Sequence, residues 1–419
     1  MDELEKRLEL LIAALPKAAE RRIGLHVSRD GERALRAGHP WLFENSIERQ
    51  SHPGKPGDIA VAFDQKRRFL AIGLYDPTSP LRMRVLQHSV PAIIDRSWLT
   101  AQLERAAQRR LPLLDGRTTG YRLVHGENDQ LPGLVVDRYD QTLVIKLYTA
   151  AWIPHLADLS AALLEVQPAQ RLVLRMSRAL QKAPEHLYNL SDGMVLLGPE
   201  QTGSVIFLEH GLRFEADPSH GQKTGFFLDQ RENRARVEQL AAGKRVLNVF
   251  AYTGGFSLYA ARGGARQVTS LDISRPALAA AERNFALNQF VPTVAAAEHQ
   301  LLAGDAFQVM LQMHAAQQRF DLVIIDPPAF AKQQTEVERA LSAYAQLTRL
   351  GLDVLQPGGT LVLASCSSRV SNAAFVATVT QAAAQAGRPL QIFAQTAHAV
   401  DHPIGFAEGA YLKCLYATA

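Results

Sequence analysis

The fold of the second half of the chain is decided by two stretches, FDLVIIDPPAF (residues 320–330) and GTLVLASCSSR (residues 359–369). Each begins with a run of apolar residues, a pattern typical of a buried parallel strand. Polar side chains follow, Asp326 in the first stretch and Cys366 in the second. Because open α/β sheets bind ligands at the carboxyl ends of their strands, we expect the acid and the thiol to meet at one sheet edge. Such a pair suggests chemistry on a pyrimidine ring.

Alternating strand and helix patterns continue this interpretation from about residue 214 to the end of the sequence. Helical patterns lie between the successive strands, which predicts a doubly wound, mostly parallel sheet of the Rossmann-like α/β class over residues 214–419. The predicted strands are Arg245–Phe250, Gln267–Asp272, Leu301–Ala303, Phe320–Ile325 and Gly359–Ser365, with a last antiparallel pair at Leu390–Ala394 and Tyr411–Tyr416. They make a seven-stranded sheet.

The first of these strands runs into a glycine-containing turn and a helix, in RVLNVFAYTGGFSLYAA (residues 245–261). Such a turn lets a ligand approach the backbone and a helix N-terminus, but it is not the G-x-G-x-x-G of dinucleotide-binding proteins. The next strand ends in Asp272, which could accept from both hydroxyls of a ribose. Asp305 follows the third strand and could accept from an adenine amino group. Either aspartate could instead cap a helix, but together they favour an adenosine pocket for S-adenosylmethionine over NAD.

An upstream segment, GQKTGFFLDQRENR (residues 221–234), supplies two more candidate contacts. Arg231 would stand early in a helix and could pair with the methionine carboxylate; the alternative is a solvent ion pair with Asp229 or Glu232. Phe226 or Phe227 could cover the ligand. The predicted cofactor-binding residues are Phe227, Arg231, Asn248, Phe250, Tyr252, Thr253, Gly254, Asp272, Ile273, Ser274, Asp305, Ala306 and Asp326.

The first half of the chain shows short strand patterns separated by Gly and Pro from Arg22 to about Ser89. Within it, GERALRAGHPWLFENSI (residues 31–47) predicts a short helix, a turn and a strand. This arrangement resembles a PUA domain, a small β-barrel that binds structured RNA, and we assign it to residues 22–90. Residues 91–213 alternate helices and strands, which predicts a central α+β domain. There we expect Glu127, Asp129 and Asp137 to cap turns.

The composition, 47% hydrophobic and 21% charged over 419 residues, is typical of a globular protein of two or three domains. No window offers the roughly 18 apolar residues of a membrane span. Two cysteines give no disulfide framework and indicate the cytoplasm. No metal site is predicted. Residues 1–21 predict an amphipathic helix, and a homodimer is one way to bury its apolar face of Leu4, Leu8, Leu11 and Leu15.

The net charge of +4, from 45 basic and 41 acidic residues, is a weak sign of a nucleic-acid partner. The distribution of charge is more informative, because the basic clusters noted here lie in the first half. They could be ordinary solvated surface, but their shared location favours a face that tracks RNA. They comprise Lys66, Arg67, Arg68, Arg82, Arg84, Arg105, Arg109, Arg110, Arg117, Arg122, Arg171, Arg175, Arg178 and Lys182.

Motifs along nearly the whole chain then point to one family. They are GERALRAGHPWLF, YRLVHGENDQLPGLVVDRY, KTGFFLDQR, NVFAYTGGF, LDIS, DPPAF, SCSS and FAEGAYLKC. The chain resembles the bacterial cytosine-5 methyltransferases of large-subunit ribosomal RNA, which carry a PUA domain, a central α+β domain and a class I methyltransferase domain. The resemblance implies S-adenosylmethionine as methyl donor and a cytosine of ribosomal RNA as acceptor.

Cytosine-5 methylation gives the residues of the two opening stretches definite roles. Carbon 5 is a poor nucleophile, and a thiolate that adds to carbon 6 activates it toward a sulfonium methyl group. Cys366 is the predicted nucleophile, and Asp326 is predicted to hydrogen-bond or protonate ring nitrogen 3. Pro327 and Pro328 would stiffen the substrate loop, and Phe330 would stack on a base.

Two other functions fit part of the same pattern. An amino methyltransferase would use Asp326 and Pro327 to orient an exocyclic nitrogen and would need no cysteine, so Cys366 argues against it. A non-catalytic RNA-binding assembly factor would not need the aspartates of the cofactor pocket. Better-known RNA cytosine-5 methyltransferases often carry a second cysteine directly after the acidic strand motif, whereas this chain has DPPAF at that position and no cysteine. Cys414 is predicted to be a core residue. The group that releases the product is therefore not assigned.

Overall fold

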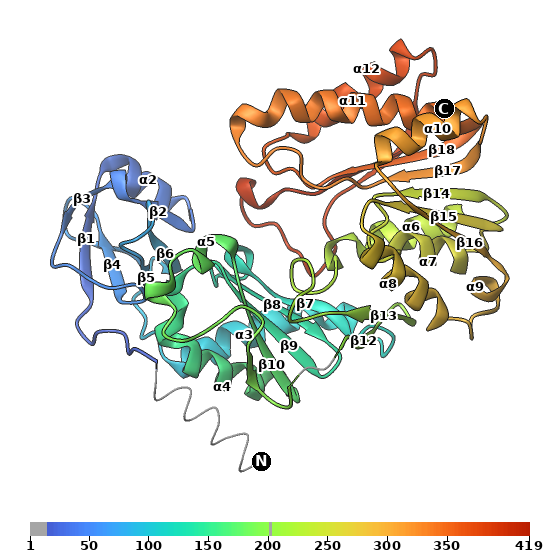
Figure 1. Ribbon diagram of the computed structural model, residues 1–419. Helices are drawn as coiled ribbons and strands as arrows, with labels where there is room; N and C mark the ends of the chain where they lie inside the picture. Colours follow the sequence, from blue (N-terminus) through green and yellow to red (C-terminus); the bar gives the residue numbers. More distant parts are fainter. Residues whose placement is uncertain (1–14, 201–202) are drawn as a thin grey trace. The chain divides into compact units, whose positions relative to one another are not determined.

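The computed structural model describes residues 15–200 and 203–419 (Figure 1). These residues gather into two compact units. The first unit contains the chain up to Gly211 together with two later segments, Ala216–Phe226 and Val400–Phe406. The second contains the rest of the chain from Leu212 to Ala419. Two short segments that lie within the methyltransferase-like half of the sequence thus belong to the first unit.

The N-terminal part of the first unit is a six-stranded sheet in the order β2-β6-β5-β4-β1-β3. Neighbouring strands are antiparallel except for the pair β1 and β4. The predicted helix, turn and strand of residues 31–47 are confirmed. The elements are β1 (Ile23–Val27), α2 (Arg29–Arg36), β2 (Trp41–Phe43), β3 (Ile47–Gln50), β4 (Ile59–Phe63), β5 (Phe69–Tyr75) and β6 (Leu81–His88).

The central part of the first unit is a five-stranded sheet in the order β11-β10-β9-β8-β7, as the α+β pattern predicted. One apolar core joins it to the preceding sheet, since Ile72 of β5 belongs to the same buried cluster as Leu103 of α3 and Ile145 of β9. The elements are α3 (Arg96–Arg110), β7 (Gly120–His125), β8 (Leu134–Tyr139), β9 (Thr142–Leu147), α4 (Leu156–Val166), β10 (Arg171–Met176), α5 (Arg178–Gln181), β11 (Val195–Leu197) and β12 (Val205–Glu209).

The predicted N-terminal helix falls mostly on residues 1–14, which lie outside the described residues. Residues 15–21 are not helical, and Leu15 packs against the core of the first unit. The homodimer through the leucine face stays a prediction. Among the residues that the structure describes, no helix is both long and apolar enough to cross a membrane.

Several basic residues that the sequence assigned to an RNA-tracking face are instead buried in the first unit. Their guanidinium groups are paired with carboxylates, because a buried charge is tolerated only when it is compensated. The pairs are Arg84–Asp76, Arg110–Asp129, Arg122–Asp137 and Arg175–Asp192. The prediction of an RNA-tracking face is therefore wrong for Arg84, Arg110 and Arg175, which are buried, whereas Arg122 is half-buried.

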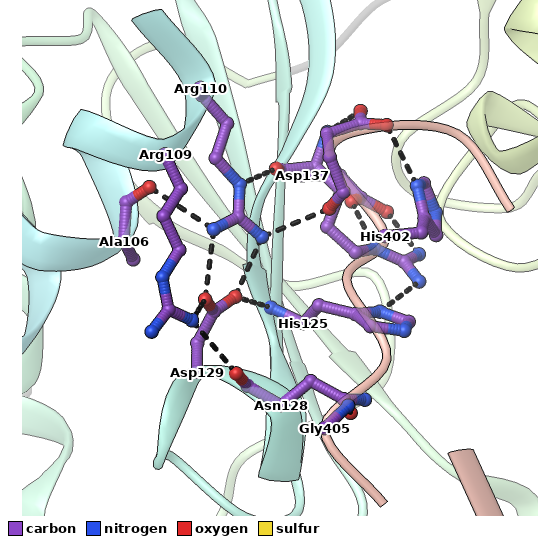
Figure 2. Close-up of polar contacts among 11 residues, drawn as sticks. Ala106, Arg109, Arg110, His125, Asn128, Asp129, Asp137, His402 and Gly405 are labelled. Carbon is purple, nitrogen blue, oxygen red and sulfur yellow. Dashed lines mark hydrogen bonds and ion pairs between the residues drawn. The ribbon is translucent and has the colours of Figure 1, made fainter. Parts of the chain in front are cut away.

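Arg110 and Asp129 form the centre of a buried polar cluster (Figure 2). The guanidinium donates to both Asp129 oxygens, at 2.9 and 2.6 Å, and to the carbonyls of Arg122, Ala106 and Asp401. These five hydrogen bonds use all five N–H groups of an arginine. Asp401 lies in the segment Val400–Phe406, so this cluster fixes a late part of the chain in the first unit.

Of the three acidic residues of the central part that were predicted to cap turns, Asp129 accepts from a local backbone N–H, that of His125 at 2.7 Å, whereas Asp137 and Glu127 have other partners. Asp137 is fully buried and accepts two hydrogen bonds from Arg122, at 2.7 and 2.9 Å. Asp129 pairs with Arg110, and Glu127 accepts from the indole nitrogen of Trp41 at 2.9 Å. The side-chain partners Trp41, Arg110 and Arg122 lie outside the local turn, and no local pattern shows such contacts.

The second unit is built on a seven-stranded sheet in the order β16-β15-β14-β17-β18-β20-β19, which confirms the doubly wound prediction. The strand β20 is antiparallel to both of its neighbours, β18 and β19, and the other neighbouring pairs are parallel. The elements are β13 (Leu212–Ala216), α6 (Arg231–Leu240), β14 (Arg245–Val249), α7 (Gly255–Arg262), β15 (Gln267–Asp272), α8 (Arg275–Ala286), α9 (Pro292–Ala296), β16 (Glu298–Ala303), α10 (Ala306–Ala315), β17 (Phe320–Ile325), α11 (Val337–Val354), β18 (Leu355–Ser365), α12 (Asn372–Gln385), β19 (Gln391–Thr396) and β20 (Lys413–Thr418). Residue 216 at the end of β13 already belongs to the first unit.

Two strands begin earlier than the sequence predicted. The strand β16 starts at Glu298 rather than at Leu301, because an edge strand tolerates the polar residues of EHQ. The strand β18 starts at Leu355, which pairs with Phe320 across an irregularity in register, although QPGG reads as a turn. The strand order reverses between β14 and β17, and ligands of open α/β sheets bind at such a reversal.

Candidate active site

The loop between β14 and α7 has an unusual backbone. Phe250, Tyr252 and Gly254 have φ angles of 61°, 49° and 76°, in the left-handed region that side chains other than glycine rarely adopt. In residues other than glycine, such conformations cost about 1–3 kcal/mol each, and they cluster at functional sites. At Gly254 a Cβ atom would lie 2.8 Å from the Cβ of Ala281, so a side chain there would clash. The backbone of this loop is therefore strained at Phe250 and Tyr252, and position 254 has no room for a side chain.

Asp272, at the end of β15, holds this loop in place. One carboxylate oxygen accepts from the backbone N–H of Tyr252 and the other from that of Ser274, both at 2.8 Å. Ser274 caps α8 by accepting from the N–H of Ala277, so Asp272 is not the helix cap. Each of its oxygens keeps a lone pair for another donor. Ile273 beside it is 73% exposed, which leaves an apolar side chain open to a ligand.

Asp305 differs from Asp272, because it does cap its helix. One carboxylate oxygen accepts from the backbone N–H of Gln308 at 3.1 Å, in the first turn of α10. Asp305 is exposed and Ala306 behind it is buried. The alternative that the sequence left open, a helix N-cap, is thus present, and the second carboxylate oxygen is the one left for an adenine amino group.

Two buried polar atoms, one at the end of β14 and one in the loop, have no hydrogen-bond partner among the described residues. They are Oδ1 of Asn248 and Oγ1 of Thr253. Asn248 is 1% exposed, and its amide nitrogen donates to the Oγ of Ser257 at 2.9 Å. Buried polar atoms are seldom left unpaired in native proteins. The loop therefore fits a ligand that carries polar groups, as an adenosine with an amino-acid tail does.

The upstream segment places one of its two phenylalanines near this loop. The ring of Phe227 meets that of Tyr252 edge to face, with centroids 5.0 Å apart. Phe226, the other candidate, is buried in the first unit, where its N–H donates to the hydroxyl of Tyr139. Arg231 begins α6 and is fully buried, 3.9 Å from Glu232. The ion pair with Glu232 that the sequence left open is therefore present, with a buried guanidinium group and a partly exposed carboxylate.

The DPPAF and SCSS segments meet at the carboxyl ends of β17 and β18, as predicted. The Sγ atom of Cys366 lies 3.8 Å from the carbonyl oxygen of Pro327, within range of a weak hydrogen bond. Cys366 is half-buried and not part of a disulfide. The N–H of Asp326 lies 3.4 Å from the carbonyl of Val249, which ties the DPPAF segment to the end of β14 and the cofactor loop.

Hydroxyl groups hold these two segments together. The Oγ of Ser367 accepts from the N–H of Phe330 at 3.1 Å and contacts the hydroxyl of Tyr344 at 3.1 Å. Tyr344 also contacts the Oγ of Ser365 at 2.8 Å. Burial raises the pKa of Tyr344, and the nearby charges of Cys366 and Asp326 add to that rise against the opposing hydrogen bonds. The acid and the thiol thus share one small environment.

The side chains predicted to contact the substrate differ in how far they are buried. Pro327 is buried and Pro328 is exposed. Phe330 is half-buried, with its ring 5.3 Å from that of Tyr344 at an angle of 61°. Phe330 therefore already packs on one face within the protein.

The sequence analysis missed Lys413. The motif YLKCLY was read for its cysteine, and Cys414 is indeed buried in β20, where burial raises the pKa of its thiol to about 12. The lysine beside it is 7% exposed and lies at the start of the strand next to β18. A lysine inside an otherwise apolar strand motif was the signal that could have revealed it.

Comparison with known proteins defines the class of this chain. A sequence model of S-adenosylmethionine-dependent methyltransferases matches residues 121–393, and a model of PUA-like domains matches residues 25–88. The chain is thus an S-adenosylmethionine-dependent methyltransferase with a PUA-like domain. It is 48% identical to a ribosomal RNA large subunit methyltransferase of Deinococcus radiodurans, over 96% of this chain and 98% of that one. It is 36% identical to ribosomal RNA large subunit methyltransferase I of Pseudoalteromonas translucida, over 93% and 97%. The chain belongs to this family.

Two solved structures share the fold. One is a candidate S-adenosylmethionine-dependent methyltransferase from Streptococcus mutans, with a TM-score of 0.79, 22% identity and coverage of 94% of this chain and 100% of that one. The other is a candidate methyltransferase complexed with SAH, with a TM-score of 0.80, 22% identity and the same coverage. The first unit and the second unit therefore both have counterparts in one known architecture.

Proposed function

We propose that this protein transfers a methyl group from S-adenosylmethionine to carbon 5 of a cytosine in large-subunit ribosomal RNA, through a covalent bond between Cys366 and the pyrimidine. The family supports ribosomal RNA as the substrate, since its relatives are named for it. The observation that carries the choice of carbon 5 is the half-buried thiol of Cys366, 3.8 Å from the DPPAF loop.

The cofactor would lie over the β14–α7 loop. Asp272 would accept from the ribose hydroxyls with the lone pairs that Tyr252 and Ser274 leave, and Ile273 would pack on the adenine. Asn248 and Thr253 would meet polar groups of the ligand with their unpartnered atoms. Phe227, on the ring of Tyr252, is proposed as a cover for the bound molecule.

The remaining cofactor residues complete this proposal. Phe250 and Gly254 would present their backbone to the ligand, and Asp305 with Ala306 would face the adenine edge. Arg231 would pair with the carboxylate of the methionine moiety. When bound, S-adenosylmethionine supplies an electrophilic methyl group.

The residues of the two strand ends would then carry the reaction. The thiolate of Cys366 bonds to carbon 6 of cytosine, while Asp326 donates a hydrogen bond or proton to ring nitrogen 3 and stabilises the charge that develops there. The electron pair reaches carbon 5, which takes the methyl group. A base then removes the proton from carbon 5, the bond from carbon 6 to sulfur breaks, the thiolate leaves, and ring nitrogen 3 gives back to Asp326 any proton that it accepted. Pro328 and Phe330 would border the base.

The rival reaction, methylation of an exocyclic nitrogen, is disfavoured by one contact. That chemistry uses the carbonyl after the acid to orient the amino group, and here the carbonyl of Pro327 faces the thiol of Cys366. An amino methyltransferase would gain nothing from a thiol in that position. An RNA-binding assembly factor would not need the strained cofactor loop.

A covalent trap tests the proposal. RNA that carries 5-fluorocytosine should form a stable adduct with the full-length protein and S-adenosylmethionine, because fluorine cannot leave carbon 5 as a proton does. Denaturing gel electrophoresis and peptide mapping should place the adduct on Cys366. Cys366→Ala should form no adduct and lose turnover, while it still binds the cofactor.

The chain supplies a matched control. Its second cysteine, Cys414, is buried in β20, so Cys414→Ala should form the adduct as the wild type does. An active Cys366→Ala enzyme would overturn the carbon-5 mechanism in favour of the amino methyltransferase. Bisulfite mapping of ribosomal RNA from cells with and without the protein would then locate the modified nucleotide.

A further inference from the structure

Lys413 occupies an unusual position for a lysine. It is the first residue of β20 and pairs with Ser365 of β18, the residue before Cys366. Its side chain is almost fully buried, at 7% exposure. Its Nζ atom donates to the carbonyl oxygens of Ser367 and Val370, both at 2.7 Å. The ammonium group therefore holds the loop that directly follows Cys366.

A buried ammonium group is costly unless an opposite charge or good hydrogen bonds compensate it. In the part of the chain that the structure describes, Lys413 forms an ion pair with no carboxylate, and its two acceptors are neutral carbonyls. Burial lowers the pKa of Lys413 to about 8, and the nearby charge of Cys366 acts in the opposite direction. The negative charge that would best compensate this ammonium is thus the thiolate of Cys366.

We propose that Lys413 is a positioning residue of the methyl transfer: it fixes the Cys366 segment and its positive charge stabilises the thiolate that attacks cytosine. The inference rests on the proposed function, because a thiolate is needed only if Cys366 is the nucleophile. A nearby cation is a general means of keeping a cysteine ionised near neutral pH. When sulfur leaves carbon 6, the same charge stabilises it again as a leaving group.

The titratable groups around Cys366 come from three further elements. Asp326 stands at the end of β17, Tyr344 lies on α11 and Lys413 begins β20. An ionised Asp326 would repel a thiolate because the two charges have the same sign. Burial raises the pKa of Tyr344, so this hydroxyl stays neutral. Of these three groups, only Lys413 favours the thiolate.

A purely structural role for Lys413 is the main rival, and Tyr344 provides the matched control. Tyr344 holds the same segment through Ser365 and Ser367, but it carries no charge. Tyr344→Phe removes two hydrogen bonds from the segment and leaves the charge in place. Lys413→Met removes the charge and keeps a side chain of similar length, and Lys413→Arg keeps the charge.

The experiment measures the rate at which iodoacetamide alkylates Cys366 in the full-length protein without RNA. Mass spectrometry of peptides separates Cys366 from the buried Cys414. At pH 7 we expect Lys413→Met to slow alkylation about 3–10-fold, because a smaller fraction of Cys366 is ionised. The effect is limited because each remaining thiolate is somewhat more nucleophilic. Lys413→Arg and Tyr344→Phe should stay within about twofold of the wild type. Circular dichroism checks folding, and Lys413→Gln replaces Lys413→Met if the latter does not fold.

The pH dependence separates charge from structure. The gap between wild type and Lys413→Met should close as pH rises past about 8, where the ammonium loses its proton. Equal rates at pH 7, or an equal loss in Tyr344→Phe, would overturn the role of Lys413. A different outcome is slower alkylation in Lys413→Met together with no 5-fluorocytosine adduct in the wild type. That result would support the stabilisation of the thiolate by Lys413 but refute the carbon-5 reaction.

Discussion

The buried guanidinium of Arg110 should be among the largest single contributors to the stability of the first unit. Arg110→Met removes one partner of an ion pair whose side chains are both 1% exposed, and it leaves Asp129 buried with less compensation. Breaking a buried pair in this way costs about 3–5 kcal/mol. The lost bonds to three backbone carbonyls favour the upper part of that range, whereas the N–H of His125 and the side chain of Arg109 still bond Asp129 and limit the loss.

The chain offers a matched control next to it. Arg109 bonds the same carboxylate at 2.9 Å, but its side chain is 47% exposed. Exposed pairs contribute about 0–1 kcal/mol, so Arg109→Met should change little. Arg110→Lys keeps the charge but offers three donors instead of five, and should fall between the two.

Urea unfolding followed by tryptophan fluorescence measures this effect on the right part of the molecule. The three tryptophans, Trp41, Trp98 and Trp152, all lie in the first unit. With a urea dependence of about 2–3 kcal/mol per M, Arg110→Met should lower the midpoint by about 1–2 M. If Arg110→Met and Arg109→Met shift the midpoint equally, burial does not decide the strength of these pairs and the reasoning fails.

Three further predictions concern the cofactor, pH and RNA. Asp272→Ala should weaken binding of S-adenosylmethionine by about 1.5–3 kcal/mol in calorimetry, the range of hydrogen bonds to a charged group; unchanged affinity in a folded variant would exclude Asp272 from the site. Burial lowers the pKa of His299 to about 4 from 6.5, so between those pH values the unfolded chain binds more protons and stability falls as pH drops. The stability difference between wild type and His299→Gln, measured by circular dichroism, should therefore shrink from pH 7.5 to about pH 5, and a constant difference would contradict this. Binding of structured RNA by the full-length protein should weaken steadily as salt rises, and salt-independent binding would argue against phosphate contacts.

The strand ends were predictable from sequence because the signal there is local. An apolar run that stops at Asp272, Asp326 or Cys366 marks a buried strand and the residue that leaves it. The sheet order then follows from the usual handedness of strand–helix–strand connections. Which aspartate caps a helix was not predictable, because Asp272 and Asp305 have similar surroundings in sequence. In the structure Ser274 is the cap of the helix after β15, because its hydroxyl accepts from the N–H of Ala277.

The buried charges of the first unit were not predictable, because their partners lie far along the chain. Arg110 and Asp401 are 291 residues apart, and an arginine at the end of a helix reads as solvated. The buried position of Lys413 was not predictable for a related reason. Its acceptors are carbonyl oxygens of a loop whose position the sequence does not reveal. In each case long-range contacts overrode the ordinary preference of a charged residue for the surface.

The placement of Val400–Phe406 has a consequence for how this protein can be divided. The carboxylate of Asp401 accepts from the N–H of Arg122 at 2.8 Å, and its carbonyl accepts from Arg110. A fragment that ends near residue 214 lacks both acceptors and would leave buried donors unpaired, at about 1–3 kcal/mol each. The first unit is therefore not complete until nearly the whole chain has been made, and RNA binding has to be measured on the full-length protein.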